Sequence, residues 1–365
     1  MDRAQTIALF AEAPSLRAVL SILEMARPPP RVAGHFAVLA TRRAIHEVVE
    51  SLSQSHLKII SSSAAHLSLV VISDGESEEQ AIPIFIEKSS VAGFIFVFSY
   101  CKGDEWRERV GHFVRRLYPF VFSSFMPQGN LRLVAERLKA SIPANQTLRV
   151  VKVSQTRPLL QRLSRRRTES GIRWTDVPLQ DAFDDAEANT IHFKKVALQA
   201  CIERDREIAP TDLTVSLSSD CSVSTTTRPA WVFESILHTI VELSEQALVF
   251  ARNHTRESAT DSSSPFIAEF RSDFPIRKDD VKKIAKELRR LSDASVSIFS
   301  PGPHLRASIN DYLDGSNYEV LLTSETKLLV IPMSRATLGS ITRVIRFIYD
   351  SIGEADFKNQ ETAES

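Results

Sequence analysis

The sequence predicts an α+β protein built from two or three tandem β-α-β-β-β-α modules, each an antiparallel sheet with helices packed on one face. Three observations predict this class. Apolar runs of strand length alternate with longer segments in which apolar residues recur every three or four positions. The order of these elements is similar near the two ends of the chain. The residues between neighbouring runs are polar and turn-compatible, as in hairpins.

The last third of the chain shows the clearest pattern, and its module is expected over residues 265–353. Its strands are predicted at 266–270, 296–299, 320–322 and 328–331, and its helices at 279–291 and 338–352. Thr337 is expected to cap the final helix, and Gly353 to follow its C-terminus. Neither the sheet nor the helix could bury its apolar face alone, so the helix is expected to lie on the sheet.

The first module is expected over residues 31–143, after an N-terminal helix and proline-rich connector in residues 1–30. Its strands are predicted at 35–39, 57–60, 67–72, 82–86 and 94–98, and its helices at 45–52, 104–118 and 130–138. Pro83 suggests that its strand lies at a sheet edge, because proline cannot donate a ladder hydrogen bond. The strand at 94–98 is apolar at every position, so both of its faces need cover or an interface partner.

The middle of the chain, residues 144–252, is less regular and is interpreted as a degenerate second module. Strands are predicted at 148–153, 172–177, 193–200, 213–217 and 221–225, and a helix at 229–250, while residues 157–167 stay open between helix and loop. Residues 253–264 are polar and read as a linker, and residues 354–365 read as a disordered tail.

The predicted element order resembles two fold groups, the TATA-binding-protein-like fold and the longin/roadblock group that trafficking scaffolds use in tandem. No residue motif links the chain to either group, so the resemblance concerns the layout of elements alone.

Composition bounds the function classes. Of the 365 residues 43% are hydrophobic and 25% charged, and Lys plus Arg balance Asp plus Glu at 45 each. No overall field therefore favours a nucleic-acid partner, although a local basic patch stays open. Cys101, Cys201 and Cys221 form no C-x-x-C pair and read as small buried hydrophobes in a reducing compartment. No apolar run could span a bilayer and no signal peptide is recognisable, so a cytoplasmic or nuclear protein without a transmembrane segment is expected.

Familiar catalytic motifs are missing from the sequence. Its 11 glycines form no G-x-G, which argues against dinucleotide fingerprints, P-loops and kinase loops. His46 and Glu50 resemble a metalloprotease helix that lacks the second histidine, so a solvated helix face is favoured. The acidic residues Asp181, Asp184 and Asp185, with Glu187 beyond them, also favour a solvated face over a cation site. No catalytic, cofactor-binding or metal-binding residue is therefore predicted.

Basic side chains are the only candidate contact residues in the sequence. They lie in the stretch 157–167, and the four that could contact an anion or a partner are Arg162, Arg165, Arg166 and Arg167. A second basic face between Arg277 and Arg290 is interrupted by acids and favours a salt-bridged solvent surface.

Three hypotheses about function stay open. The leading one is a non-catalytic scaffold or regulatory subunit that acts through protein–protein contacts between its modules, as a homo- or hetero-oligomer. The alternative is a nucleic-acid-binding protein that uses sheet faces and the basic 157–167 stretch. The third is an enzyme with a site assembled from distant residues, which a deep polar pocket with several ionisable groups would favour. No cofactor is expected.

Overall fold

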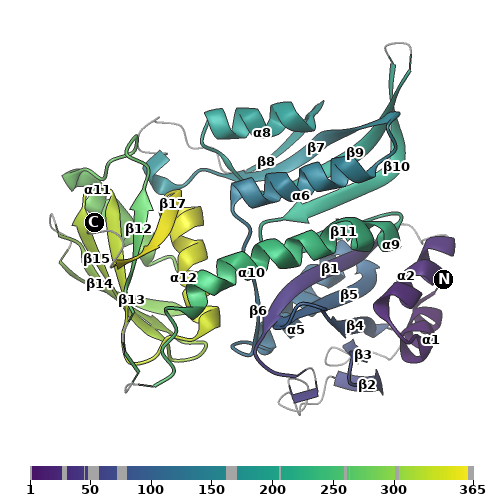
Figure 1. The fold of residues 1–365 in the computed structure, drawn as a ribbon, viewed down its shortest axis with the longest axis horizontal. Helices are drawn as coiled ribbons and strands as arrows, with labels where there is room; N and C mark the ends of the chain where they lie inside the picture. The colour runs from purple at the N-terminus through teal and green to yellow at the C-terminus, as the bar shows by residue number, and fades with distance from the viewer. Residues whose placement is uncertain are drawn as a thin grey trace. The chain divides into compact units, whose positions relative to one another are not determined.

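The computed structural model describes residues 2–26, 31–44, 46–47, 57–71, 80–161, 171–204, 207–258, 261–262, 264–300 and 304–360. They form the mixed α and β structure with antiparallel sheets that the sequence predicts (Figure 1). The chain divides into two compact units. Unit 1 contains Met1–Ser154, Ile172–Asp185 and Phe193–Glu245, and unit 2 contains Gln155–Gly171, Ala186–His192 and Gln246–Ser365.

Unit 1 holds most elements of the first two predicted modules. Its strands are β1 Val32–Thr41, β2 Leu57–Ser62, β3 His66–Val71, β4 Ile82–Lys88, β5 Phe94–Lys102, β6 Val121–Ser123, β7 Gln146–Thr156, β8 Gly171–Pro178, β9 His192–Arg204, β10 Glu207–Ser218 and β11 Ser222–Thr225. Its helices are α1 Arg3–Glu12, α2 Leu16–Met25, α4 Gly103–Glu105, η2 Trp106–Val110, α5 Gly111–Arg116, α6 Gln128–Ser141, α8 Leu179–Ala188, α9 Pro229–Val232, η3 Phe233–Leu237 and α10 His238–Arg252, where η marks a π-helical turn. Strands β7, β8 and β9 and helix α8 extend by one to three residues into unit 2, and α10 ends there.

These strands form one continuous sheet across the two predicted modules. Within the described residues its order is β2-β3-β4-β5-β1-β11-β10-β9-β7-β8, with β6 paired to β1. The junction between them is the antiparallel pairing of β1 with β11, in which His35 lies opposite Ser224. The predicted boundary at residues 143 and 144 therefore lies within one sheet, and the tandem-module layout is not confirmed.

Helices cover both faces of this sheet around β4 and β5, whereas helices on one face were expected. Phe10 of α1 packs against Phe85 and Phe98 at centroid distances of 5.7 and 5.9 Å, and Phe233 of η3 packs against Phe96. The alternate residues of β4 and β5 pack beneath η2 and α5 in a second apolar cluster. Residues 94–98 are apolar at every position, so both faces of this strand have to be covered, as the sequence suggested. Helix α1, which was not predicted, supplies part of this cover.

Pro83 lies in an interior strand, and the prediction that β4 is an edge strand is wrong. Pro83 lies opposite Val70 of β3, but the pairing of β4 with β5 begins only at Phe85. Pro83 therefore lies in a part of β4 that pairs with β3 on one side and has no ladder partner on the other. Its carbonyl oxygen accepts a hydrogen bond of 2.8 Å from the Ser99 hydroxyl, which satisfies that group without a ladder bond.

Unit 2 contains the last predicted module and two strands that the sequence did not predict. Its elements are β12 Phe266–Phe270, α11 Lys278–Leu288, β13 Ala294–Ser300, β14 Arg306–Asp311, β15 Asn317–Ser324, β16 Lys327–Pro332, α12 Leu338–Phe347, η4 Ile348–Ile352 and β17 Ala355–Asn359. The missed strands are β14 and β17. Among the described residues these strands form a sheet in the order β13-β14-β15-β16-β12-β17. The first five repeat the order β2-β3-β4-β5-β1 of unit 1.

The end of the chain departs from the prediction of a disordered tail over residues 354–365. Ala355–Asn359 forms β17 and pairs antiparallel with β12, and its Phe357 ring lies near Phe266. Residues 361–365 lie outside the described part. Alternation is weak in this short strand, so the backbone pairing that orders it left little signal in the sequence.

The final helix begins and ends as the sequence suggests, with one difference. The Thr337 hydroxyl accepts from the Ser340 amide at 3.2 Å, which is the predicted N-cap. Gly353 follows η4, but its backbone is extended rather than left-handed. Glycine fits there because a Cβ would lie 2.9 Å from atoms of Leu160 and Phe270.

Candidate functional site

The four arginines predicted as contact residues, Arg162, Arg165, Arg166 and Arg167, lie outside the described residues. The start of the same basic stretch is described. Arg157 is only 4% exposed, and the turn that follows it buries Leu159 and Leu160. Arg157 therefore cannot act as an exposed phosphate contact, and residues 157–161 form a packed segment rather than an open loop.

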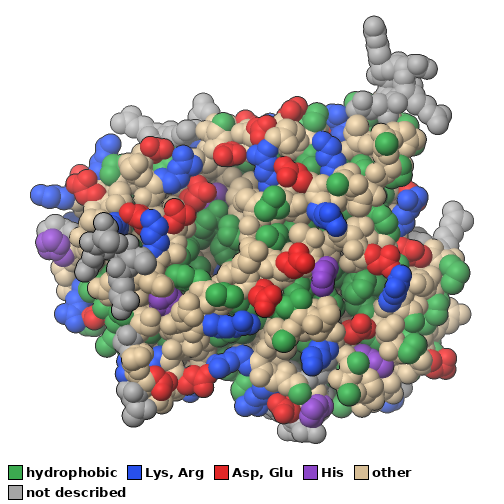
Figure 2. All heavy atoms as spheres, in the orientation of Figure 1, with side chains coloured by type: hydrophobic (Ala, Val, Ile, Leu, Met, Phe, Trp, Pro, Cys, Tyr) green, Lys and Arg blue, Asp and Glu red, His purple; other side chains and the backbone are tan. Residues whose placement is uncertain are grey.

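The other charged segments are solvated faces, as expected. On α8, Asp184 is half-exposed and forms an ion pair of 2.9 Å with Arg132 of α6. On α11, Lys283 pairs with Asp280 and Arg290 with Glu287. The face of the molecule in Figure 2 likewise shows Lys and Arg side chains interspersed with Asp and Glu. In each of these pairs at least one side chain is exposed, and ion pairs of this kind contribute little to stability and do not make a site.

The three cysteines are buried and unbridged, as predicted. Burial raises the pKa of the Cys101 thiol to about 12, so it is an unreactive core group. No cluster of three or more His, Cys, Asp or Glu side chains that could hold a metal ion occurs in the described ranges. His46 is exposed, and Glu50 lies outside those ranges. None of the helices in the described part of the chain combines the length and apolar composition needed to cross a bilayer.

A polar pocket of about 850 Å³ lies within unit 1, on the side of the sheet that carries η2. We name it the basic pocket. Its floor is formed by strands β1, β11, β10, β9 and β7, and residues of α4 and η2 form a wall. On the β5 half of the sheet η2 and α5 cover this face with apolar side chains. On the β10 half the same face carries hydroxyl and charged groups instead.

Strand register brings the floor residues together. His35 of β1 lies opposite Ser224 of β11, Ser224 lies opposite Ser216 of β10, and Ser216 lies opposite Ala197 of β9. In the next row Lys195 of β9 lies opposite Ser218. Because side chains alternate between the two faces of a strand, residues two apart share the pocket. The pattern Ser-x-Ser in both β10 and β11 is thus a polar strip across adjacent strands.

Three cations line the basic pocket, from β7, β9 and η2. Lys152, Lys195 and Arg107 line it together with the carboxylates of Asp104 and Asp220. Although Lys195 keeps much of its side chain in solvent, the surrounding protein lowers the pKa of its ammonium group by desolvation. Asp220 opposes this shift, and the positive charges of Arg107 and Lys152 add to it. Arg107 and Lys152 are therefore each close enough to Lys195 to repel its charge.

His35 of β1 lines the same pocket. It is 7% exposed, and its ring stacks on Trp106 with the centroids 5.2 Å apart and the planes 15° from parallel. Burial, assisted by the charge of Lys195, lowers the pKa of His35 to about 4 against a hydrogen bond with the Cys101 backbone that raises it. At neutral pH the ring is uncharged. Its Nε2 atom is buried and meets no hydrogen-bond partner among the described residues.

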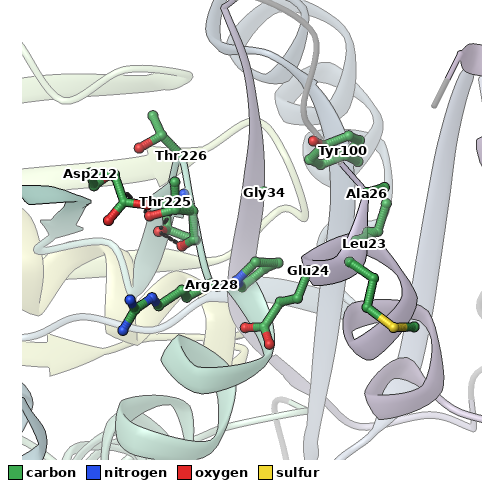
Figure 3. Close-up of a pocket in the computed structure, with 12 residues that line it drawn as sticks. Leu23, Glu24, Ala26, Gly34, Tyr100, Asp212, Thr225, Thr226 and Arg228 are labelled. Carbon is green, nitrogen blue, oxygen red and sulfur yellow. Dashed lines mark hydrogen bonds between the residues drawn. The ribbon is translucent and has the colours of Figure 1, made fainter.

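A second pocket of about 320 Å³ also lies within unit 1, between α2 and the loop before α9 (Figure 3). Its polar groups are largely occupied by internal bonds. The Glu24 carboxylate accepts from the Trp231 amide at 3.0 Å, and the Thr227 hydroxyl donates to the Asp212 carbonyl at 3.0 Å. Burial raises the pKa of Tyr100, which also lines it, to about 12. This pocket offers less for a polar ligand than the basic pocket.

The sheet edges differ in a way that bears on partner binding. Four strands end the two sheets within the described residues, namely β2, β8, β13 and β17. Charged residues occur in three of them, at Lys58 of β2, Arg173 and Asp176 of β8, and Asp356 and Lys358 of β17. Strand β13, Ala294–Ser300, contains no charged residue and no proline. Its Val296 and Ile298 are half-exposed, and Phe299 is 64% exposed.

Neither the basic pocket nor the edge of β13 was predicted from the sequence. The signal for the pocket was present in the alternating serines of residues 216–224, but their partners His35, Lys152 and Arg107 are far away in sequence. The signal for the edge was the seven-residue run without charge at 294–300. Both need the strand order before they can be interpreted.

Comparison with known proteins adds no further assignment. No protein-family model matches the sequence, and a search of curated proteins finds no significant match.

Proposed function

We propose that the chain is a non-catalytic scaffold or regulatory subunit that works through protein–protein contacts, with strand β13 as its contact element. The observation that carries this proposal is the uncharged edge of the unit 2 sheet. Natural sheets usually block their edges with charged residues, proline or a bulge, because an unpaired edge is a template for another strand. The other three end strands carry charge, and β13 does not.

The geometry of β13 favours an extended segment of a partner protein as the occupant. The register shift against β14 lies between Ile298 and Ser300, so residues 294–298 form a regular stretch with its free edge outward. Main-chain groups along that edge could pair with an added strand, which is a common mode of peptide recognition. The half-exposed Val296 and Ile298 would contact alternate apolar side chains of that segment, which gives selectivity without charge.

The basic pocket supports a second candidate, nucleic-acid binding. The lining of this pocket includes three cations and an aromatic ring, Trp106, and such combinations can contact phosphates and bases. The two carboxylates in the same pocket oppose it. An enzymatic role stays a prediction from the same pocket, since several ionisable groups line it.

The test of the proposal is a quantitative comparison of partners captured by the full chain and by a Val296→Lys variant. Val296→Lys should lower the amount of specifically captured partner at least tenfold. The reason is that the lysine would place an unpaired charge between β13 and the added strand, where it would be buried. An Asp356→Lys variant is the matched control, since it adds positive charge to the opposite edge strand of the same sheet. Substitutions at such exposed positions change the free energy of unfolding by about 0.5 kcal/mol or less.

Two results would contradict the proposal. Equal capture by Val296→Lys and by the unaltered chain would exclude β13 as the contact. A purified chain that dimerises alone, and becomes monomeric on Val296→Lys, would replace the partner protein with a second copy. Salt-dependent retention of RNA or DNA by the unaltered chain, with no protein partner found, would favour the second candidate.

A further inference from the structure

Helix α11 carries a row of four basic side chains that form no ion pair within the described part of the chain. The row, which we name the α11 stripe, consists of Lys278, Lys282, Lys286 and the C-cap residue Arg289. All four are exposed, and the ion pairs of this helix use Lys283 and Arg290 instead. Residues three or four apart are neighbours on a helix, so like charges at these spacings destabilise it. The stripe is therefore suited to an acidic partner.

The connection from β12 to β13 places α11 beside the β13 edge. Four antiparallel pairings separate β12 from β13 in the sheet, so the two strands run in the same direction. A helix that joins two parallel strands of one sheet crosses over the strands between them in a right-handed turn. Ala307 and Ile309 of β14 are fully covered, whereas Val296 and Ile298, which lie opposite them on β13, are half-exposed. The helix cover therefore ends at β13, on the face that holds Val296 and Ile298.

The handedness of this crossover also sets which flank of α11 is turned to the β13 edge. Val281, Ile284 and Leu288 are buried and point to the sheet. At about 100° per residue, the stripe lies on one flank of this buried face, and the largely buried carboxylates of Asp280 and Glu287 lie on the other. A right-handed crossover turns the stripe to the β13 side. It turns the acidic flank to the side of η4, and α11 does contact η4.

The ends of the stripe lie near the ends of β13. Helix α11 runs opposite to β13 and only residues 289–293 separate them, so Arg289 lies near Ala294, and Lys278 lies towards Ser300. The stripe spans about three helical turns, about 16 Å, and β13 spans about 23 Å. The two half-exposed apolar residues of β13 lie between these ends. A strand added to β13 would thus meet apolar groups in its middle and positive charges at its ends.

We propose that the segment that pairs with β13 is acidic, with Asp or Glu on its helix side at the positions beside Ala294 and Ser300 and apolar residues at the two positions between. This inference rests on the proposed function and names the chemistry of its partner. Carboxylates beside the stripe would neutralise its charges, and complementarity of this kind adds selectivity and speeds association. A basic segment with the same apolar residues would be repelled.

The experiment measures the binding of three end-capped, dye-labelled peptides to the full chain by fluorescence anisotropy. Their sequences are ETVTVTE, KTVTVTK and VTETETV, which read the same in both directions, so that strand direction does not matter. ETVTVTE should bind at least tenfold more tightly than KTVTVTK, in which the charge is reversed. It should bind at least threefold more tightly than VTETETV, which has the same composition with the acids in the middle. A rise from about 0.1 M to about 1 M salt should reduce the first difference, because the Debye length falls from about 10 Å to about 3 Å.

A matched pair of double variants tests the stripe itself. Lys282→Gln with Arg289→Gln should weaken the binding of ETVTVTE at least fivefold and should not weaken KTVTVTK. Lys283→Gln with Arg290→Gln is the control, because it removes one lysine and one arginine charge from the same segment outside the stripe. It should leave the affinity for ETVTVTE within twofold. Circular dichroism and thermal unfolding of each variant report whether the fold is retained.

The outcomes separate this inference from the proposed function. If ETVTVTE and KTVTVTK bind equally and Val296→Lys removes both, β13 is a docking edge and the acidic partner is excluded. The acidic partner is also excluded if the two double variants weaken ETVTVTE equally. If no peptide binds, or if Val296→Lys leaves the binding of ETVTVTE unchanged, the docking edge itself is excluded and the inference with it. Single-stranded RNA that binds through Lys282 and Arg289 at least tenfold more tightly than ETVTVTE would assign the stripe to nucleic acid instead.

Discussion

The regions β1–β6 and β12–β17 have the same strand order. They differ in which strands pair with the second edge of the first strand, β1 or β12. Strand β12 has five residues, and β17 pairs with all of them. Strand β1 has ten residues; β6 pairs only with Leu39, Ala40 and Thr41, and β11 pairs with residues 34–37. A short first strand that its return strand covers completely ends the sheet. A long first strand leaves room for a further strand, and so the sheet of unit 1 continues from β11 to β8.

The same comparison extends to the helix that follows the fifth strand. In unit 1, Arg109 of η2 donates to the carbonyl oxygens of Gln80 and Val71, at 2.7 and 3.0 Å. In unit 2, Arg343 of α12 forms an ion pair of 3.0 Å with buried Asp311. Val71 and Asp311 each end the third strand of their region. Both regions thus use an arginine to hold the helix to one strand end, but one uses backbone carbonyls and the other uses a carboxylate.

The largest effect is expected from removing β17. A chain that ends at Gly353 loses five residue pairs with β12, and at about 1 kcal/mol for each net hydrogen bond the loss in stability of unit 2 is about 5 kcal/mol. Hydrogen exchange of the β12 amides measures this effect, since these amides should exchange at least a hundredfold faster. A chain that ends at Gln360 serves as the control and should match the full chain. Equal protection of β12 in both chains would show that β17 does not close the sheet.

The next effect concerns the two arginine contacts. Asp311→Ala should destabilise unit 2 by about 3–4 kcal/mol, because it leaves the largely buried Arg343 without its counter-ion. Arg109→Met should cost unit 1 about 1–2 kcal/mol, since it removes the hydrogen bonds to the Gln80 and Val71 carbonyls, which are neutral groups. Urea unfolding of both variants gives the two values. If the two losses are equal, the carboxylate adds nothing to the contact in unit 2.

The stability of unit 1 is expected to depend on pH through His35 of β1, which lies between the apolar and the polar half of its sheet. The pKa of His35 falls from 6.5 to about 4 on folding, mainly by burial. The unfolded chain therefore takes up the proton first, so the stability that His35 contributes is complete above pH 6.5 and is lost as the pH falls towards 4. Lys195 and the Cys101 backbone are the groups that act on its ring electrostatically, and Trp106 stacks on it.

When the pH falls from about 7.5 to 5, the free energy of unfolding of the unaltered chain should decrease by about 2 kcal/mol more than that of a His35→Gln variant. Urea unfolding at a series of pH values measures the difference. A variant of the exposed His112 on α5, His112→Gln, should run parallel to the unaltered chain. Parallel curves for His35→Gln and the unaltered chain would show that His35 is solvated.

The smallest effect separates two glycines. Gly353→Ala should cost about 1–2 kcal/mol, because the new Cβ would lie 2.9 Å from Leu160 and Phe270 side-chain atoms that must shift. Gly34→Ala in β1 should cost less than about 1 kcal/mol, since its nearest atoms, in Phe98 and Pro229, lie at 3.3 Å. Thermal unfolding of the two variants ranks them. A reversed order would show that the backbone after η4 yields more readily than the core around β1.

The sequence by itself determined the class of the protein and most of its elements. Apolar periodicity placed α2, α11 and α12 and the strands β5, β12 and β16, and Thr337 marked the start of the last helix. These features depend on neighbours within a few residues, so local pattern was sufficient. The same reasoning missed α1 and β17, whose order comes from contacts with Phe85 and with β12 rather than from their own pattern.

Only the tertiary structure decided how the strands join and therefore where a site can form. Nothing local to β1 or β11 shows that they pair, yet that register places His35 beside Ser224 and joins two predicted modules into one sheet. It also leaves β13 as an uncharged edge and gathers Lys152, Lys195 and Arg107 from three distant segments. Residue periodicity fixes which face of an element is apolar, but the partner of each edge depends on long-range pairing between segments far apart in the chain.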